Sequence, residues 1–362
     1  MATSAPAVEC DSGATGRRAK RKRCAYYSVF GYLFGLCLLL VLFRWVDDRL
    51  WFALLLSYAP RLIWGAPFLV LIPWFLRLGW GWHWAPLALA GWLFWVPLMG
   101  WNYAWTRPDS EGLQVRVLSY NVGLLRQGVS QVCEELFAQN ADVIGLQEVP
   151  RDKSDPLASC LFKRWPHLAK ESEFMVASRF PLGDLQPLKG FYYNGEPWTD
   201  RGMKLPVQTP AGVFSLYLVH PGSARPIFYA LRKAPLKAQL TWQHIIGPYV
   251  WGSARVNSET RALQFASIFR QARDEAGWVV IAGDTNLPHL SRVLSVHSEG
   301  FVDGFRRAGR GLGYTFPSAW PVLRLDRIFT RAPLSVRDFR VGCDASASDH
   351  LCVMADIVLP TR

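Results

Sequence analysis

The chain of 362 residues contains few cysteines and little charge. Its seven cysteines are odd in number and show no Cys-x-x-Cys spacing, so the sequence indicates neither a disulfide scaffold nor a zinc site. Charged residues make up 19% of the chain and hydrophobic residues 51%, a balance that excludes disorder for most of it. A chain of this length has room for two domains of ordinary size.

Charge is scarcest in the first hundred residues, where tryptophan is abundant. Eleven of the 17 tryptophans lie between Trp45 and Trp105, which is not the composition of a soluble domain. We therefore expect a basic tail over residues 1–24, a membrane domain over 25–105 and a soluble domain over 106–362. Residues 107–362 carry 30 basic and 24 acidic side chains, a net charge of +6, which permits a phosphate-bearing substrate without indicating a nucleic-acid coat.

The apolar runs of the membrane domain predict about three transmembrane helices. Tyr26–Phe43 provides 18 uncharged residues, roughly enough to cross about 30 Å of hydrocarbon. Arg61 in mid-bilayer would cost about 2.5–3.5 kcal/mol, so we centre the second span on Leu62–Leu76 and expect Leu50–Pro60 to be interfacial. The third span is expected at Trp84–Trp101, with tryptophans near both ends as at membrane interfaces.

Other interpretations of the N-terminal region fit less well. A cleaved signal peptide would have a shorter apolar run and a cleavage site of small residues, and a buried helical hairpin would have shorter runs. The basic cluster Arg17–Arg23 resembles a nuclear or nucleic-acid signal, but next to a span it favours a cytoplasmic N-terminus. Three spans would place the soluble domain outside the cytoplasm, whereas two would place it inside.

The soluble part has the pattern of a mixed α/β domain, with short apolar runs between turns and a few helical stretches. One helix is expected at Ser130–Asn140, and another after Asn257-Ser258, ending at Gly277. The expected strands are Val115–Tyr120, Val143–Gln147, Phe174–Ala177, Val213–Val219, Val279–Ala282, Arg327–Phe329 and Cys352–Val358.

Polar residues stand at the ends of these strands. Asn121, Glu148, His220 and Asp284 each follow a strand, Asp326 begins one, and Ser348-Asp349-His350 precedes the last. A single Asn or Asp at a strand end is usually a turn former. Six such positions together indicate side chains directed at one point, where metal binding, proton transfer and phosphate contact become feasible.

The motifs SYNVG, LQEV, ASRFPL, LVHP, IAGDTN, RLDRI and SDH occur in this order. This order resembles the endonuclease/exonuclease/phosphatase superfamily, over about Val115–Ile357. The resemblance implies a four-layered α/β sandwich, in which two mixed sheets are flanked by helices, with the active site at one end of the sheets. It also implies cleavage of phosphoester bonds with a divalent metal.

Glu148 is a hard oxygen ligand suited to Mg²⁺ or Mn²⁺, and by resemblance Asn121 and Asp349 complete or support that site. The resemblance also implies that Asp284 orients and deprotonates the attacking water. Asn286 would hold the phosphate or that water, although a simple turn also explains Asp284 and Asn286.

For the second half of the site, the resemblance implies that Asp326 orients His350, which donates to a phosphate oxygen. His220 would make a second phosphate contact, and four carboxylates could pair with it: Glu171, Glu173, Glu196 and Asp200. Thr285 and Arg327 stand where the family often has aromatic or apolar residues, and we expect them to alter the pocket wall.

We therefore expect a membrane-anchored, metal-dependent phosphoester hydrolase with an extracytoplasmic catalytic domain over 106–362. The partners expected are the lipid bilayer and a phosphate-ester substrate, either lipid-linked or nucleic acid, and the sequence indicates no protein partner. An extracytoplasmic nuclease is the alternative, with Arg225–Lys237 as the nearest candidate for a basic groove with aromatics. A non-catalytic binding protein would have lost Glu148, Asp284 or His350, and all three are present.

Overall fold

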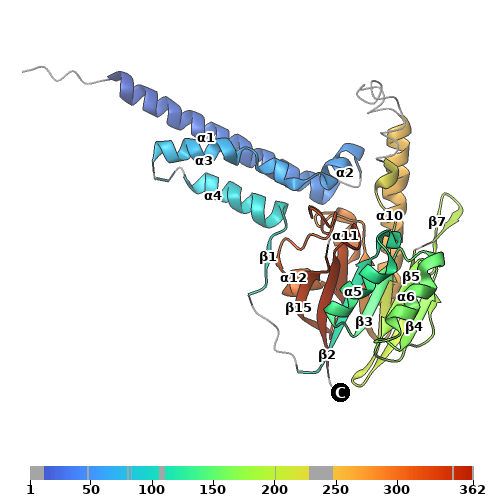
Figure 1. Ribbon diagram of the computed structural model, residues 1–362. Coiled ribbons are helices and arrows are strands. Elements are labelled where there is room, and N and C mark those ends of the chain that lie inside the picture. The colour runs from blue at the N-terminus through green and yellow to red at the C-terminus, as the bar shows by residue number, and fades with distance from the viewer. Residues whose placement is uncertain are drawn as a thin grey trace, which may run out of the picture. The chain divides into compact units, whose positions relative to one another are not determined.

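The computed structural model describes residues 12–46, 49–79, 81–82, 84–105, 111–199, 201–227, 248–344 and 346–360. The chain forms two compact units (Figure 1). The helical unit comprises Met1–Val41 and Arg61–Met99, and the sandwich unit comprises Leu42–Pro60 and Gly100–Arg362.

The helical unit contains three apolar helices: α1 (Ser12–Val41), α3 (Phe68–Leu78) and α4 (Trp84–Leu93), which continues into the turn Phe94–Leu98. Helix α1 packs against both α3 and α4. Two stretches, Lys20–Val46 and Arg61–Leu78, are long and apolar enough to cross a membrane. The third expected span corresponds to the shorter apolar stretch Trp84–Leu98, so two of the three expected spans reach full length.

The segment between the first two apolar helices belongs to the sandwich unit. It contains the short helix Leu42–Val46 and α2 (Trp51–Tyr58). Phe43 is fully buried, and Leu54 packs against Ala224, Ile227 and Ala254. The stretch Leu50–Pro60, expected to be interfacial, therefore forms a helix that covers part of the sandwich.

Two six-stranded mixed sheets form the centre of the sandwich unit. The first has the order β15 (Ser335–Gly342), β16 (Cys352–Leu359), β2 (Leu113–Asn121), β3 (Val143–Gln147), β5 (Phe174–Ser178) and β4 (His167–Glu171). The second has the order β12 (Val302–Asp303), β14 (Asp326–Thr330), β11 (Trp278–Asp284), β10 (Gly212–Val219), β9 (Gly202–Thr209) and β6 (Gln186–Pro187). The pairs β2–β3 and β10–β11 are parallel, and the other neighbours in these sheets are antiparallel.

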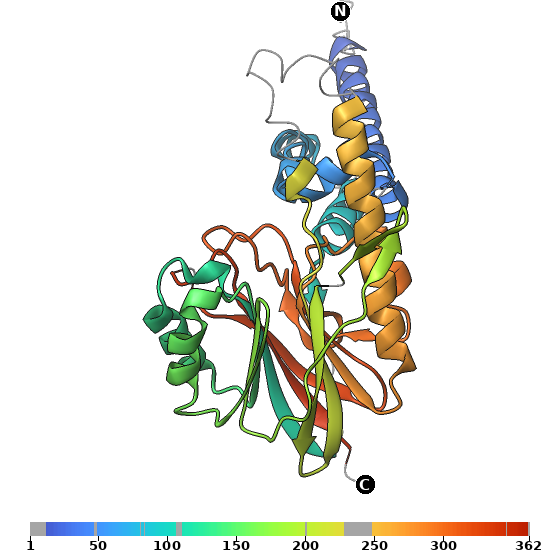
Figure 2. The same ribbon diagram turned by 90° about the vertical axis from the view of Figure 1, so that its right-hand side faces the viewer.

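The sheets and helices form four layers (Figure 2). A core that includes Val117 and Leu218 fills the space between the two sheets. Helices α5 (Val129–Gln139) and α6 (Ser154–Leu161) cover the outer face of the first sheet. Helices α10 (Pro248–Asp274) and α11 (Arg292–His297) cover the second. The expected sandwich of two mixed sheets is confirmed.

Smaller elements lie outside these layers. Strand β1 (Asn102–Tyr103) pairs with β13 (Arg310–Gly311), and β7 (Phe191–Tyr193) pairs with β8 (Glu196–Trp198). Short helical turns occupy Arg61–Gly65, Gly123–Leu125 and Arg151–Lys153, and α12 spans Gly304–Ala308.

All seven expected strands are present, and the longest shift of a boundary is two residues. The helix expected after Asn257-Ser258 instead begins at Pro248. Asn257 is therefore inside the helix, where its side-chain amide donates a hydrogen bond to the Ser223 carbonyl at 2.8 Å. Asn257 resembled a residue that caps the start of a helix, but its side chain bonds to a loop that is distant in the sequence.

The expectation of no disulfides is wrong for the sandwich unit. Cys133 of α5 is bonded to Cys160 of α6, with their Cα atoms 6.6 Å apart, and Cys343 is bonded to Cys352, with Cα atoms 5.5 Å apart. The odd total concealed an even number in this unit, because Cys24 and Cys37 are free and Cys10 lies outside the described residues. The second disulfide closes the loop that carries Asp349 and His350, which restricts that loop even in the unfolded chain.

Candidate active site

The strand topology brings the predicted polar residues to one end of the sandwich. The carboxyl ends of the parallel strands β2 and β3 carry Asn121 and Glu148, and those of β10 and β11 carry His220 and Asp284. Strand β14 pairs antiparallel with β11 in a register that sets Asp326 opposite Asp284. The backbone hydrogen bonds between the strands therefore bring these residues together, independently of any contact between their side chains.

Asn121 links the two carboxylates that follow β3 and β11. Its Nδ2 lies 3.1 Å from Glu148 Oε1 and 3.2 Å from Asp284 Oδ2, and its Oδ1 accepts a hydrogen bond from the Gly123 amide. Glu148 has a φ of 56°, a left-handed conformation that costs energy in a residue other than glycine. The fold therefore holds this carboxylate at the strand end against a local preference.

Asp284 and Asn286 form a tight turn after β11. The Asn286 amide donates to Asp284 Oδ1 at 2.8 Å, and Asn286 Nδ2 donates to the Pro221 carbonyl at 3.1 Å. The turn explanation is thus correct for one oxygen of Asp284. The other oxygen, Oδ2, lies 3.7 Å from His350 Nε2 and 3.6 Å from His220 Nε2, which leaves it directed into the site.

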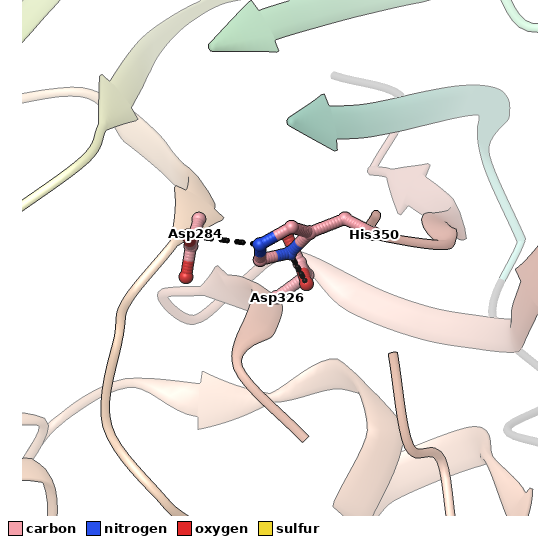
Figure 3. A group of neighbouring side chains, drawn as sticks. All are labelled: Asp284, Asp326 and His350. Carbon is pink, nitrogen blue, oxygen red and sulfur yellow. Dashed lines mark hydrogen bonds and ion pairs between the residues drawn. The ribbon is translucent and has the colours of Figure 1, made fainter. Parts of the chain in front are cut away.

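His350 and Asp326 form a buried pair (Figure 3). His350 Nδ1 lies 2.9 Å from Asp326 Oδ2, and Phe316 packs on the imidazole with ring centroids 4.8 Å apart. Burial lowers the pKa of His350, but the charges of Asp326 and Asp284 and the bond to Asp326 outweigh it and raise the pKa to about 10. The other ring nitrogen, Nε2, faces Asp284 Oδ2 at 3.7 Å.

His220 pairs with Glu173, one of the four carboxylates that the sequence left open. Its Nδ1 lies 3.2 Å from Glu173 Oε2, and Arg201 Nη2 lies 2.7 Å from Glu173 Oε1. Burial raises the pKa of Glu173, but the hydrogen bond and charge of His220 and the charge of Arg201 outweigh it and lower the pKa. Arg201 Nη2 also lies 3.2 Å from His220 Nδ1, and the other ring nitrogen, Nε2, faces Glu148 at 3.6 Å.

Two of the other carboxylates considered for His220, Glu171 and Glu196, are exposed, and the third, Asp200, lies outside the described residues. The partnership with Glu173 arises because β5 begins next to the end of β3, where the Val149 amide donates to the Glu173 carbonyl at 3.0 Å. No sequence motif marks this pairing, and the same holds for Arg201.

Asp349 lies at the edge of the group. Its half-buried side chain is close to Gly123, where an added Cβ would be 2.8 Å from Asp349 Oδ1. Gly123 also has a φ of 53°, so a close approach and the backbone both require glycine there. The charge of Asp349 also acts on His350, and the neighbouring Ser348 Oγ donates to the Asn121 carbonyl at 2.7 Å.

The two departures from the family pattern are bonded to each other. Arg327, fully buried, donates hydrogen bonds to Thr285 Oγ1, to the Leu325 carbonyl at 3.0 Å and to the Arg324 carbonyl at 2.8 Å. Burial and the charge of Arg324 lower the pKa of Arg327, and Asp303 opposes them. The guanidinium thus joins the loop before Asp326 to the turn after Asp284.

The site contains the donor set for a divalent cation. Glu148 and Asp284 direct carboxylate oxygens towards the same two groups, Asn121 and His220, and no cysteine is involved. Asp284, Asp326 and His350 also come within 4.8 Å of one another. We favour the side of Glu148, because Asp326 Oδ2 is already bonded to His350 Nδ1. Hard oxygen donors fit Mg²⁺ or Mn²⁺.

The model of the "Endonuclease/Exonuclease/phosphatase family" matches residues 118–350, which are 233 of the 362 residues. The comparison with curated proteins found no match.

Two similar solved structures are endonuclease/exonuclease/phosphatase proteins. That from Beutenbergia cavernae is 18% identical, covering 68% of this chain and 72% of that one, with a TM-score of 0.49. That from Bacteroides vulgatus is 18% identical, covering 68% and 99%, with a TM-score of 0.49. Sphingomyelinase C from Streptomyces griseocarneus is 14% identical, covering 67% and 99%, with a TM-score of 0.44.

The buried charges behind the site generate a prediction about stability. Arg324 Nη1 lies 2.7 Å from Asp303 Oδ2, and Asp303 Oδ1 caps α12 by accepting from the Phe305 amide. Asp303→Asn keeps an oxygen for the cap but removes the charge beside Arg324 and Arg327. We expect it to lower the free energy of unfolding by about 3–5 kcal/mol, measured by chemical denaturation.

The same substitution has a pH signature. Burial raises the pKa of Asp303, but the charges of Arg324 and Arg327 outweigh it and lower the pKa. The contribution of this carboxylate is therefore complete above its unfolded pKa of about 3.9 and is lost as the pH falls further. The exposed Asp155, which pairs with Lys170, provides the control, and Asp155→Asn should cost less than about 1 kcal/mol. Equal effects of the two substitutions would contradict the prediction.

Proposed function

Because the chain belongs to the endonuclease/exonuclease/phosphatase family and is thus a phosphoester hydrolase, we propose that it is a membrane-anchored, divalent-metal-dependent enzyme acting on a lipid-linked phosphate or pyrophosphate. The observation that carries the lipid assignment is the contact of Tyr58 with the turn after Asp284. The Tyr58 hydroxyl donates to the Asn286 carbonyl at 2.5 Å, and the apolar stretch Arg61–Leu78 begins three residues later. The site is thus tied to a point where the chain enters the bilayer.

Glu148 would hold the metal, supported by Asn121 and Asp349. A bound Mg²⁺ or Mn²⁺ would supply charge neutralisation on the phosphoryl oxygens. In this proposal Asp284 accepts a proton from the attacking water. Its Oδ1 is held by the Asn286 amide, which leaves Oδ2 as the base.

The two histidines act on the phosphoryl group. His350, kept protonated by Asp326, donates Nε2–H to a phosphoryl oxygen that gains charge in the transition state. His220, held at Nδ1 by Glu173 and Arg201, makes the second phosphate contact by donating Nε2–H. Asn286, whose Nδ2 donates to the Pro221 carbonyl, acts in this structure on the loop that follows His220, and a direct phosphate contact would require it to exchange that bond.

The proposed membrane topology follows from whether the number of membrane crossings is even or odd. Leu42–Pro60 and Gly100–Arg362 form one compact unit, so both lie on the same side of the bilayer. The chain between Pro60 and Gly100 then crosses an even number of times. If Arg61–Leu78 crosses, Trp84–Leu98 crosses back, and α1 makes the total three. Trp84–Leu98 would span about 22 Å as a helix, roughly 8 Å less than the hydrocarbon core. Local thinning of the bilayer would accommodate this mismatch at a cost of fractions of a kcal/mol per Å.

Two observations support an extracytoplasmic sandwich unit. The basic cluster Arg17–Arg23 favours a cytoplasmic N-terminus, and three crossings then lead outside. The disulfides Cys133–Cys160 and Cys343–Cys352 belong to oxidising compartments. For a nuclease, by contrast, the basic segment Arg225–Lys237 lies mostly outside the described residues, and an anchor brings a nuclease no closer to nucleic acid.

Reporter fusions test the topology. With alkaline phosphatase, fusions after Pro60 and after Pro108 should both be active in a bacterial host, because both points lie outside. A fusion after Trp82, between the second and third spans, should be active only with a reporter that works in the cytoplasm. Cytoplasmic activity of the Pro108 fusion would contradict three crossings and reverse the localisation.

Metal and substrate are tested together on the full-length protein in detergent. We expect Mg²⁺ or Mn²⁺ to be required for hydrolysis of a lipid pyrophosphate, and this substrate to be turned over faster than single-stranded DNA or a phospholipid. Glu148→Gln should lower activity without unfolding the protein, because it removes a charged metal ligand. Undiminished turnover in EDTA would refute the metal assignment, and preference for DNA would favour a nuclease.

The catalytic pair gives a separate prediction. Asp284→Asn and His350→Ala should each reduce the turnover rate by about 10² to 10⁴, a typical range for positioned acid–base groups. Substrate binding should change less, and the double substitution should be less than additive because both groups act on one transition state. Single-turnover kinetics measure these effects. A folded variant with the wild-type rate would refute the role given to that residue, and a folded wild type without any turnover would support a non-catalytic binding protein.

A further inference from the structure

Helix α2 lies outside the part of the chain that the family model matches, which begins at residue 118. It is nevertheless an integral part of the sandwich unit. Ala53, Leu54 and Ser57 are buried, and Leu54 packs on the 221–227 loop and on α10. This is the packing of a structural element and not of a free linker.

The last residue of α2 reaches the turn that carries Asp284. The Tyr58 hydroxyl donates to the Asn286 carbonyl at 2.5 Å and accepts a hydrogen bond from Arg261 Nη2 at 2.5 Å. The same Arg261 nitrogen donates to the Asn286 carbonyl at 2.8 Å. Tyr58, Arg261 and the Asn286 carbonyl therefore form a closed triangle of hydrogen bonds.

Arg261 is unusual because it is buried without a counter-ion. Only 2% of the residue is exposed, and among the described residues no carboxylate lies within ion-pair distance of its guanidinium. Its Nε has no hydrogen-bond partner there either. Burying a charge in this way is costly, and the bonds of its Nη2 are directed at Asn286 and at the residue that contacts it.

Asn286 connects this triangle to Asp284. Its φ of 51° is left-handed, a conformation that asparagine tolerates, and its amide is the group that holds Asp284 Oδ1. A shift of the Asn286 backbone would move Asp284 relative to His350, and small displacements of a reacting group can cost up to about 10²-fold in rate.

We propose that Tyr58 and Arg261 are positioning residues that clamp the Asn286 carbonyl and thereby fix Asp284, so that the helix between the first two membrane-spanning segments is a working part of the active site. This inference rests on the proposed hydrolase function. The anchor would then determine the geometry of catalysis as well as the location of the enzyme.

The experiment uses the full-length protein in detergent, with bis-p-nitrophenyl phosphate as a water-soluble probe and saturating Mn²⁺. Tyr58→Phe removes one hydroxyl and Arg261→Gln removes the charge. We expect each to lower kcat by about 5- to 50-fold while KM changes less than about twofold. Arg261→Lys, which retains a charged donor, should recover part of the loss.

Tyr217→Phe is the matched control, because its hydroxyl donates to Glu275 Oε2 at 2.7 Å at the other end of α10. It should leave kcat within about twofold of wild type. Hydrogen exchange supplies a readout independent of activity. The peptide containing residues 284–290 should exchange faster in Tyr58→Phe than in the wild type, and Tyr217→Phe should not have this effect.

The outcomes separate the inference from the function on which it rests. An inactive wild type would refute the proposed function, and unchanged exchange in Tyr58→Phe would then also refute the clamp. An active wild type with unchanged kcat in Tyr58→Phe overturns the clamp alone. Equal losses in Tyr58→Phe and Tyr217→Phe would mean that only general stability had changed, which also overturns it.

Discussion

The crowding of negative charge at one end of the sandwich is the constraint to which the site is adapted. Glu148, Asp284, Asp326 and Asp349 follow or precede strands whose ends the two sheets bring together. Like charges this close repel strongly where water is scarce. Between them stand N–H groups: Asn121 bridges Glu148 and Asp284, and His350 bridges Asp326 and Asp284. A divalent cation among these oxygens would relieve the repulsion that remains. The fold thus gathers the oxygen donors that such a cation requires.

The sequence predicted the strands and their polar ends well, because both signals are local. Val143–Gln147, for example, was predicted with the bounds it has, since a short apolar run between turns is fully buried there. The partner of His220 could not be chosen in the same way. Four carboxylates were equivalent in the sequence, and only the pairing of β5 beside β3 brings Glu173 to Nδ1. Strand order is a long-range property that no short motif encodes.

The same reason explains what was missed elsewhere. The disulfides were concealed by a count over the whole chain, whereas they follow from the packing of α5 on α6 and from the loop before β16. Helix α2 has the composition of an interfacial segment, and its apolar side chains fit a protein surface equally well. The composition of a segment indicates that its side chains will be buried, but it does not indicate whether they are buried in the bilayer or against another part of the protein. The docking of Leu54 on the sandwich therefore had to come from the structure.

The two departures from the family pattern, Thr285 and Arg327, are explained by their interaction with each other. Each alone replaces a residue of the pocket wall, but together they supply a buried donor and its acceptor. Arg324, Arg327 and Arg261 are all at least 96% buried, and among the described residues Asp303 is the carboxylate that pairs with the first two. These buried residues thus carry more positive than negative charge, while the site itself is acidic. Since opposite charges attract most strongly where water is excluded, a buried arginine such as Arg327, whose charge acts on Asp326, offsets part of the repulsion among the carboxylates. An aromatic wall would pack the same space without supplying that charge.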